Sequence, residues 1–267
     1  GNDMSNATSL SQSLSKESVN DRRHACQQDE ICPIVFPPKL QWIKISHSAS
    51  MDPYIPDLLL VSNSEVSYIE LRSNAVMQWP NMIQCRQNIS LQYVVTPLVE
   101  TFDFRGNFIS CIVEDFFTHC DWSSLKKLFL GSNRIGSLQD NTCNSSQNIL
   151  GFLEHLTDLK ELDLSQNRLK HIPESSFVKL KNLKTLNLSQ NQIDSWLADM
   201  KTLVSLEILD LSKNQIQYLH WNVTSALDNL NDRRNTSDKP LTVDLRGNPI
   251  LCDCASVPFI KWIYSTR

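Results

Sequence analysis

The sequence predicts an α/β solenoid, in which short parallel strands from successive coils stack into one curved sheet. The first observation behind this prediction is that leucine is unevenly distributed, with 26 of the 35 leucines at or after Leu125. The second is a recurring spacing, apolar-x-x-apolar-x-apolar-x-x-Asn-x-apolar, whose asparagines are separated by 33, 26, 34, 24, 23 and 34 residues. A unit of about 24 residues, lengthened by about ten in three intervals, is typical of a stacked repeat.

Seven copies of this spacing occur in the chain. The four copies between 125 and 216 are strong, whereas weaker copies precede and follow them. The copies begin at Val66, Val99, Leu125, Leu159, Leu183, Leu206 and Val243, and their asparagines are Asn74, Asn107, Asn133, Asn167, Asn191, Asn214 and Asn248.

Each part of the unit has a physical reason. In Leu162-Asp163-Leu164 the leucines alternate as in a short strand, so both point inward while Asp163 faces out. The asparagine turns the chain, and its amide can bond backbone groups of the bend and of the neighbouring coil. The returning half carries apolar residues, such as Ile172 and Phe177, that fill the space behind the strands. A coiled coil is disfavoured because the recurring Asn and Gly or Ser break any heptad.

The ends of such a stack need caps, because a terminal coil would otherwise expose its apolar interior. At the start, Cys26 and Cys32 indicate a disulfide-closed cap, with Trp42, Ile43 and Ile45 beneath it. After the last copy, two cysteines precede apolar residues at helix-like spacing. These residues are Cys252, Cys254, Phe259, Ile260, Trp262 and Ile263.

The repeat spacing and the capping cysteines resemble those of the leucine-rich-repeat superfamily, and most of all the ectodomains of Toll-like receptors. The family pattern supplies two further cysteines downstream, which this sequence lacks, so the resemblance implies that Cys252 and Cys254 belong to a truncated cap. The expected organisation is a flexible tail at 1–24, an N-terminal cap region at 25–63, about seven repeats at 64–248 and the start of a cysteine-flanked C-terminal cap at 249–267.

Four more cysteines, Cys85, Cys111, Cys120 and Cys143, fall on the returning halves of the early units. Four cysteines allow three pairings, and sequence does not choose among them; Cys111 with Cys120 and Cys85 with Cys111 both remain open.

A zinc site is the alternative interpretation of the Cys-x-Cys pair formed by Cys252 and Cys254. The six histidines are scattered and form no His-x-x-x-His, so we expect disulfides and no metal.

Glycosylation sequons support an extracellular location. Six asparagines precede x-Ser or x-Thr, namely Asn6, Asn88, Asn144, Asn187, Asn222 and Asn235. The sequon at Asn187 has another explanation, in which it carries no glycan, because the repeat pattern itself produces Asn-Leu-Ser on the strand. The sequons and cysteines together predict a secreted protein or the ectodomain of a single-pass membrane protein.

Composition excludes several classes of function. Lys plus Arg is 25 against Asp plus Glu at 29, for a net charge of -4, so nucleic acid is not an expected partner. No apolar run approaches the roughly eighteen residues that cross a bilayer, so membrane attachment is expected only through segments absent from this chain. The sequence has no Gly-x-Ser-x-Gly or His-Glu-x-x-His motif and only six glycines, so we expect neither an enzyme nor a cofactor.

The predicted sheet presents a concave surface suited to binding. The candidate ligand-binding residues that face outward from it are Tyr68, Arg72, Arg105, Lys127 and Phe129. Phe129 interrupts a column that is otherwise mainly acidic, which makes it the preferred contact hot spot. The long intervals 75–99, 137–157 and 217–239 are further candidates, and for 229–238 we expect a glycosylated covering.

The predicted function is therefore binding. The resemblance to Toll-like receptors implies recognition of a microbial product or a cytokine-like ligand and dimerisation of ectodomains. It also implies signalling through a membrane span and a cytoplasmic Toll/interleukin-receptor domain that are not in this chain. The alternative is a secreted or membrane-tethered adhesion or matrix protein, whose solenoid holds another protein without triggering a signal.

Overall fold

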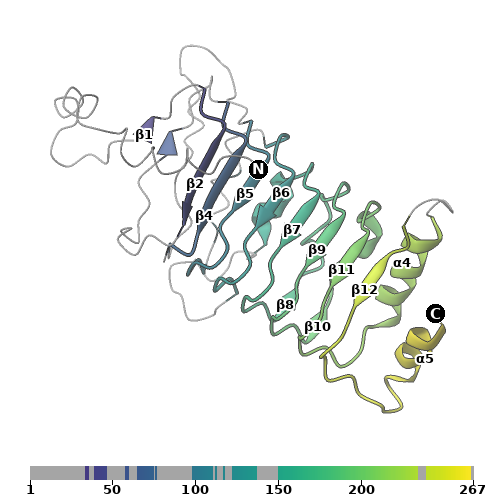
Figure 1. The fold of residues 1–267 in the computed structure, drawn as a ribbon. Helices are drawn as coiled ribbons and strands as arrows, with labels where there is room; N and C mark the ends of the chain where they lie inside the picture. The colour runs from purple at the N-terminus through teal and green to yellow at the C-terminus, as the bar shows by residue number, and fades with distance from the viewer. Residues whose placement is uncertain are drawn as a thin grey trace, which may run out of the picture.

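The described part of the chain forms a solenoid built on one parallel sheet of eight strands, in the order β12-β11-β9-β7-β6-β5-β4-β2. A computed structural model describes residues 34–35, 39–46, 58–59, 65–74, 76, 98–110, 112, 117, 122–136, 150–233 and 239–265. In Figure 1 the strands lie side by side in one row that follows the order of the chain. The predicted repeat solenoid with a parallel sheet is confirmed.

The strands are short, and two small pairs accompany the main sheet. The main sheet consists of β2 (Trp42–Ser46), β4 (Tyr68–Arg72), β5 (Thr101–Asp103), β6 (Lys127–Phe129), β7 (Glu161–Asp163), β9 (Thr185–Asn187), β11 (Ile208–Asp210) and β12 (Thr242–Asp244). The parallel pairs are β1 (Ile34–Val35) with β3 (Leu58–Leu59), and β8 (His171–Ile172) with β10 (Ser195–Trp196). The helices are η2 (Gly151–His155), η3 (Met200–Thr202), α4 (Trp221–Asp232) and α5 (Val257–Ser265).

The core lies behind the sheet and repeats once per coil. Leu128, Leu162 and Leu186 pair across β6, β7 and β9, and each is at most 1% exposed. Aromatic rings fill the space between the sheet and the returning halves. In the early coils the ring centroids of neighbouring aromatic residues are 5.5 to 5.6 Å apart, as for Phe102 with Trp122 and Trp122 with Phe117. Stacking is obligatory because no coil can bury this face alone.

A ladder of asparagines satisfies the backbone at the end of each strand. Asn167 shows the pattern: its Nδ2 donates to the carbonyls of Leu164 in its own coil, at 3.1 Å, and Leu130 in the preceding coil, at 3.0 Å. Its Oδ1 accepts from the N–H of Ile135 at 2.9 Å. Equivalent bonds link coils at Asn107, Asn133, Asn191, Asn214 and Asn248. The predicted role of the repeated asparagine is confirmed.

The residue before each asparagine of this ladder adopts the left-handed backbone conformation. Its φ lies between 52° and 73° in all seven coils, and it is glycine only at Gly106 and Gly247. The other five positions carry serine, glutamine or lysine, for which this conformation costs roughly 1–2 kcal/mol. The hydrogen bonds of the asparagine ladder stabilise the turn, and the turn requires this left-handed conformation.

The strand β2 was not among the seven predicted copies. It lies within the segment predicted to be the N-terminal cap and pairs with β4 over five residues, from Trp42–Tyr68 to Ser46–Arg72. Ile43 is buried and Ile45 is partly buried, but Trp42 is 53% exposed, so the prediction that Trp42 lies beneath the cap is wrong. Alternate residues of a strand face opposite sides, which places Trp42 on the outer face.

The long interval before the last strand contains a helix rather than a loop covering. In α4, Val223, Ala226, Leu227 and Leu230 recur at the spacing of one helix face and are buried against the core. The expectation for 229–238 is therefore corrected for its first four residues, which lie at the end of α4, while 234–238 lie outside the described residues.

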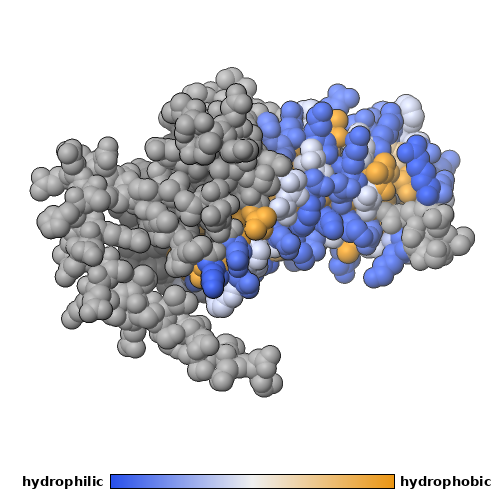
Figure 2. All heavy atoms as spheres, turned by 90° about the horizontal axis from the view of Figure 1, so that it is seen from above, coloured by the Kyte–Doolittle hydropathy of each residue, from blue (hydrophilic) through white to orange (hydrophobic). Residues whose placement is uncertain are grey.

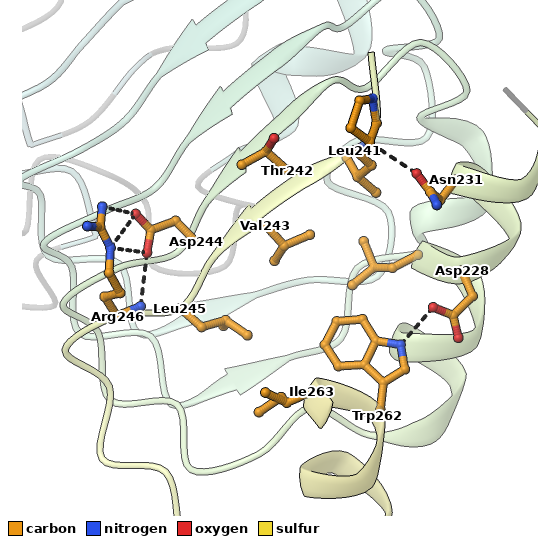
Figure 3. A pocket seen from close by; sticks show the side chains of 12 residues that line it. Asp228, Asn231, Leu241, Thr242, Val243, Asp244, Leu245, Arg246, Trp262 and Ile263 are labelled. Carbon is orange, nitrogen blue, oxygen red and sulfur yellow. Dashed lines mark hydrogen bonds and ion pairs between the residues drawn. The ribbon is translucent and has the colours of Figure 1, made fainter. Parts of the chain in front are cut away.

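The predicted helix after the last repeat is present as α5, and it packs against α4. Phe259 is 3% exposed, and Trp262 Nε1 donates to Asp228 Oδ1 at 2.7 Å. Figure 3 shows the Asp228 and Trp262 side chains beside a cavity between β12 and the two helices, which has a volume of about 650 Å³. Val243 and Leu245 line it and are only partly buried. No helix within the described ranges has the length and hydrophobicity of a bilayer span.

Candidate functional site

One column of side chains runs across the outer face of the sheet. It contains the residue of each strand that lies between two inward-facing residues, and these residues are in register: Lys44, Glu70, Asp103, Phe129, Asp163, Asn187, Asp210 and Asp244. Seen from above, the described part of the surface is mainly hydrophilic, with a few separate hydrophobic groups (Figure 2). The strand pattern predicts that the members of this column in the seven copies face out; at Glu70 and Asp103, which are only 3% and 0% exposed, this prediction of exposure is wrong.

Asp103 is the centre of a charged cluster. Arg72, at the end of β4, donates from Nε and Nη2 to Asp103 Oδ2 at 2.8 and 2.6 Å. Arg105 donates from Nε to Oδ1 at 2.9 Å and from Nη2 to Oδ2 at 2.6 Å. Arg105 lies two residues after Asp103, in the turn that follows β5, and its backbone N–H also donates to Asp103 Oδ1 at 3.3 Å. Two guanidinium groups therefore share one buried carboxylate.

Glu70 forms a second charged centre beside the first. Tyr68 Oη donates to Glu70 Oε2 at 2.8 Å, and Lys44 Nζ lies 3.1 Å from the same oxygen. Burial alone would raise the pKa of Glu70, but the hydrogen bonds from Tyr68 and Lys44 outweigh it and hold that pKa below its usual value. Burial, followed by the hydrogen bond to Glu70, raises the pKa of Tyr68 to about 12. Glu70 is thus ionised and Tyr68 is neutral at physiological pH.

Phe129 completes the cluster on the neighbouring strand. The guanidinium carbon of Arg105 lies 4.7 Å from the centroid of the Phe129 ring, a cation–π geometry. Phe129 is half-buried, so it is less exposed than expected for an outward-facing aromatic residue. We call the following residues the Asp103 patch: Tyr68, Glu70, Arg72, Asp103, Arg105 and Phe129.

The structure brings four of the five predicted ligand-binding residues into the Asp103 patch. The fifth, Lys127, lies on β6 and pairs with Glu161 at 2.8 Å. Sequence reasoning treated Asp103 and Glu70 as ordinary members of the acidic column and missed their role in holding the arginines. A signal was available in the Asp-x-Arg spacing, which recurs at Asp244 and Arg246, where Nη2 lies 2.6 Å from Oδ2.

The pKa values of the aspartates in these two Asp-x-Arg pairs are shifted in opposite directions from the usual value. Burial raises the pKa of Asp103 to about 6 even though the Arg72 guanidinium lowers it, and Glu70 and Asp163 raise it further. At Asp244 the hydrogen bond from Arg246 holds the pKa below its usual value. Carboxyl carbon shifts followed by NMR between pH 2 and pH 8 should therefore place the midpoint of Asp103 well above that of Asp244.

The shift at Asp103 also fixes the sign of its effect on stability. A carboxyl whose pKa is raised from 3.8 in the unfolded chain to about 6 in the fold favours folding most below pH 4, and this contribution is lost as pH rises through 6. The shift corresponds to roughly 3 kcal/mol. Equal midpoints for Asp103 and Asp244 would contradict the burial argument.

The patch is suited to binding rather than to proton transfer. Both of its carboxylates are held by cations, and the polar groups turned outward are guanidinium N–H groups beside an aromatic face. Such groups recognise carboxylates and other planar anions and provide contact area for a protein partner. Within the described ranges, no three His, Cys, Asp or Glu side chains are arranged to hold a metal ion.

The predicted modification sites are only partly within the described residues. Asn222 is exposed, whereas Asn187 is half-buried on β9 and its Oδ1 accepts from the N–H of Ser189 at 3.0 Å. Cys252 and Cys254 are exposed free thiols. The remaining sites lie outside the described residues: Asn6, Asn88, Asn144, Asn235, Cys26, Cys32, Cys85, Cys111, Cys120 and Cys143.

The protein-family models that match this chain describe the same kind of repeat that its sequence and its sheet show. Family models described as leucine rich repeat match residues 150–193 and 202–218. The chain is a leucine-rich-repeat protein. Its matches indicate a repeat family and no catalytic family.

Relatives of this leucine-rich-repeat chain include Toll-like receptors. It is 27% identical to Toll-like receptor 5 of Homo sapiens over 220 residues, which are 80% of this chain and 23% of that protein. It is 32% identical to Toll-like receptor 4 of Pinctada imbricata over 170 residues, which are 63% of this chain and 17% of that protein. The chain thus spans less than a quarter of the length of these two relatives.

A solved structure shares the fold. The crystal structure of human trophoblast glycoprotein matches with a TM-score of 0.53 and 18% sequence identity, covering 90% of this chain and 89% of that one. At this identity the likeness concerns the leucine-rich-repeat architecture alone.

Proposed function

We propose that this leucine-rich-repeat chain is a ligand-binding part of an extracellular Toll-like receptor ectodomain, which recognises a microbial product or a cytokine-like protein. The observation that carries the proposal is the Asp103 patch, where two guanidinium groups and an aromatic ring lie together on the sheet. The similarity to Toll-like receptors over 80% of the chain supports the choice of receptor class. Dimerisation, and signalling through a membrane span and a cytoplasmic domain, belong to the same proposal for the longer protein.

Three properties of the patch support its use as a contact surface. The arginines are held in place by Asp103, so little conformational entropy is lost when they bind a partner. Their side chains are still 38% and 36% exposed at Arg72 and Arg105. Arginine beside an aromatic ring is also a composition that is enriched among binding hot spots.

The variant Arg105→Ala is expected to weaken ligand binding about tenfold or more, the loss typical of a contact hot spot. The chain, secreted from animal cells and labelled with a fluorophore, is titrated onto heat-killed Gram-negative bacteria, Gram-positive bacteria and yeast, and binding is measured by flow cytometry. Arg72 continues to pair with Asp103 in this variant, so the sheet should remain folded, which circular dichroism checks.

The matched control is Arg246→Ala. It removes the same Asp-x-Arg contact from the last strand, where the Arg246 side chain is 89% exposed, and should change binding less than about twofold. Equal losses in the two variants would refute the assignment of binding to the Asp103 patch. Saturable binding to other animal cells but to none of the microbial probes would instead support the adhesion alternative.

A further inference from the structure

A groove of about 690 Å³ lies beside the start of α4. Its walls come from the coil that contains β10 and from the segment that leads into α4. The lining residues include Glu174, Asp194, Ser195, Leu197, Tyr218, His220 and Asn222. None of these residues belongs to the Asp103 patch, so the groove is a separate surface.

Large apolar side chains are exposed in this groove and next to it. Leu197 is 63% exposed and Tyr218 is 45% exposed, and both line it. Trp221, between the lining residues His220 and Asn222, is 68% exposed, and its ring centroid is 5.9 Å from that of His220. Clustered exposed apolar side chains usually mark a surface that something covers.

The rim of the groove also carries a glycosylation sequon, Asn222-Val223-Thr224. The Asn222 side chain is exposed, and its Oδ1 accepts a hydrogen bond from His220 Nδ1 at 2.8 Å. This contact fixes the amide and leaves Nδ2, the atom that carries an N-linked glycan, without a bond to any other described residue. Thr224 is 7% exposed in the folded helix, but glycan transfer occurs on the unfolded chain and is not hindered by that burial.

We propose that an N-linked glycan on Asn222 folds back into this groove and covers Tyr218, Trp221 and Leu197. This inference rests on the proposed extracellular location. In the transfer, Nδ2 attacks C1 of the first sugar of a lipid-diphosphate-linked oligosaccharide. The new N–C1 bond replaces the C1–O bond, Nδ2 loses one proton, and the lipid diphosphate leaves.

The chemistry of the groove matches a sugar. The apolar C–H face of a pyranose ring packs on aromatic side chains because their rings present large apolar faces. Tyr218 lines the groove, and the exposed Trp221 is the residue next to Asn222. The hydroxyl and acetamido groups at the edge of the sugar need polar partners. Glu174, Asp194 and Ser195 also line the groove and supply them.

The other sequon in the described part of the chain offers no such groove. Asn187 lies on β9 in register with Asp163 and Asp210, and its Oδ1 also accepts from Ser189 Oγ at 2.8 Å. Its neighbours on the outer face are acidic rather than aromatic. Asn187 is therefore the natural control site.

The test combines site occupancy with exposure of individual residues. The chain is secreted from animal cells, and glycopeptide mass spectrometry measures occupancy at every sequon. Hydroxyl-radical footprinting then measures oxidation of Tyr218 and Trp221 in the wild type, in Asn222→Gln and in Asn187→Gln. The wild type treated with peptide N-glycosidase under native conditions, which leaves aspartate at each occupied asparagine, provides a second comparison without the glycan.

We expect occupancy at Asn222 and at least a threefold rise in oxidation of Tyr218 and Trp221 in Asn222→Gln and in the deglycosylated wild type, with no rise in Asn187→Gln. Unchanged oxidation despite an occupied Asn222 would overturn the inference. An empty Asn222 beside other occupied sequons would overturn it too, while the proposed receptor function would stand. If no sequon carries a glycan, the inference and the extracellular function both fail.

Discussion

Replacing Asn167 by alanine is expected to lower the free energy of unfolding by about 3–5 kcal/mol, because it leaves several buried backbone groups without a partner. The side chain is 6% exposed and donates to the carbonyls of Leu130, Leu164 and Ser165 at 3.0 to 3.1 Å. It also accepts from the N–H of Ile135. Alanine can replace none of these bonds. Urea unfolding followed by far-UV circular dichroism measures the loss.

The matched control for Asn167→Ala is Asn182→Ala. Asn182 is exposed, and its two bonds, to Thr157 O at 3.2 Å and to Asp158 Oδ1 at 3.3 Å, are at the surface. Its removal should change stability by no more than about 0.5 kcal/mol. Equal shifts in the two urea midpoints would show that the buried asparagines do not hold the coils together.

Removing the ring of Phe177 is the second change with a large expected effect. Phe177 is 0% exposed and its ring lies 6.0 Å from that of Trp196 in a stacked arrangement. The variant Phe177→Ala loses this burial and leaves a cavity in a region that cannot fully collapse, so we expect a loss of about 3–5 kcal/mol. The thermal midpoint measured by circular dichroism should fall accordingly.

Val204→Ala serves as the comparison for Phe177→Ala. Val204 is 52% exposed, and shortening it should leave the thermal midpoint within a degree or two, the effect of about 0.5 kcal/mol or less. A midpoint in Phe177→Ala that falls no further than in Val204→Ala would contradict the view that the returning halves supply core rather than covering.

The sequence was most informative where one chemical requirement recurs in every coil. The inward position of Leu128, Leu162 and Leu186 and the asparagine of each turn follow from spacing alone. The strand β2 escaped prediction because it has alternating Ile43 and Ile45 but no asparagine after it. An edge strand pairs with a neighbour on one side only, so it does not need the asparagine that completes the repeat pattern in the other coils.

The helix α4 was overlooked for a different reason. Its buried residues Val223, Ala226 and Leu227 are at helical spacing, but they stand among asparagines and aspartates that favour turns. The segment forms a helix because packing of its apolar face against the core outweighs the local preference of these residues for turns.

The candidate site could be predicted in part only. The strand pattern placed Tyr68, Arg72, Arg105 and Phe129 on the outer face, which the structure bears out. It could not show that Arg72 reaches the carboxylate of Asp103, because that contact joins residues 31 positions apart and depends on the register of β4 with β5. Burial of Asp103, and hence its raised pKa, is likewise a property of the assembled coils.

The asparagine ladder gives the solenoid a polarity. Asn191 bonds Leu188 in its own coil and Leu164 and Leu169 in the coil before it, and the other ladder asparagines follow suit. At the last described coil Asn248 accepts from the N–H of Ile216, whereas the equivalent N–H of Ile250 turns back to Asn248 O at 2.9 Å. Each coil is thus held by hydrogen bonds from the asparagine of the coil that follows it. A break between two coils removes the asparagine hydrogen bonds that hold the coil before the break. The asparagine hydrogen bonds among the coils after the break stay in place.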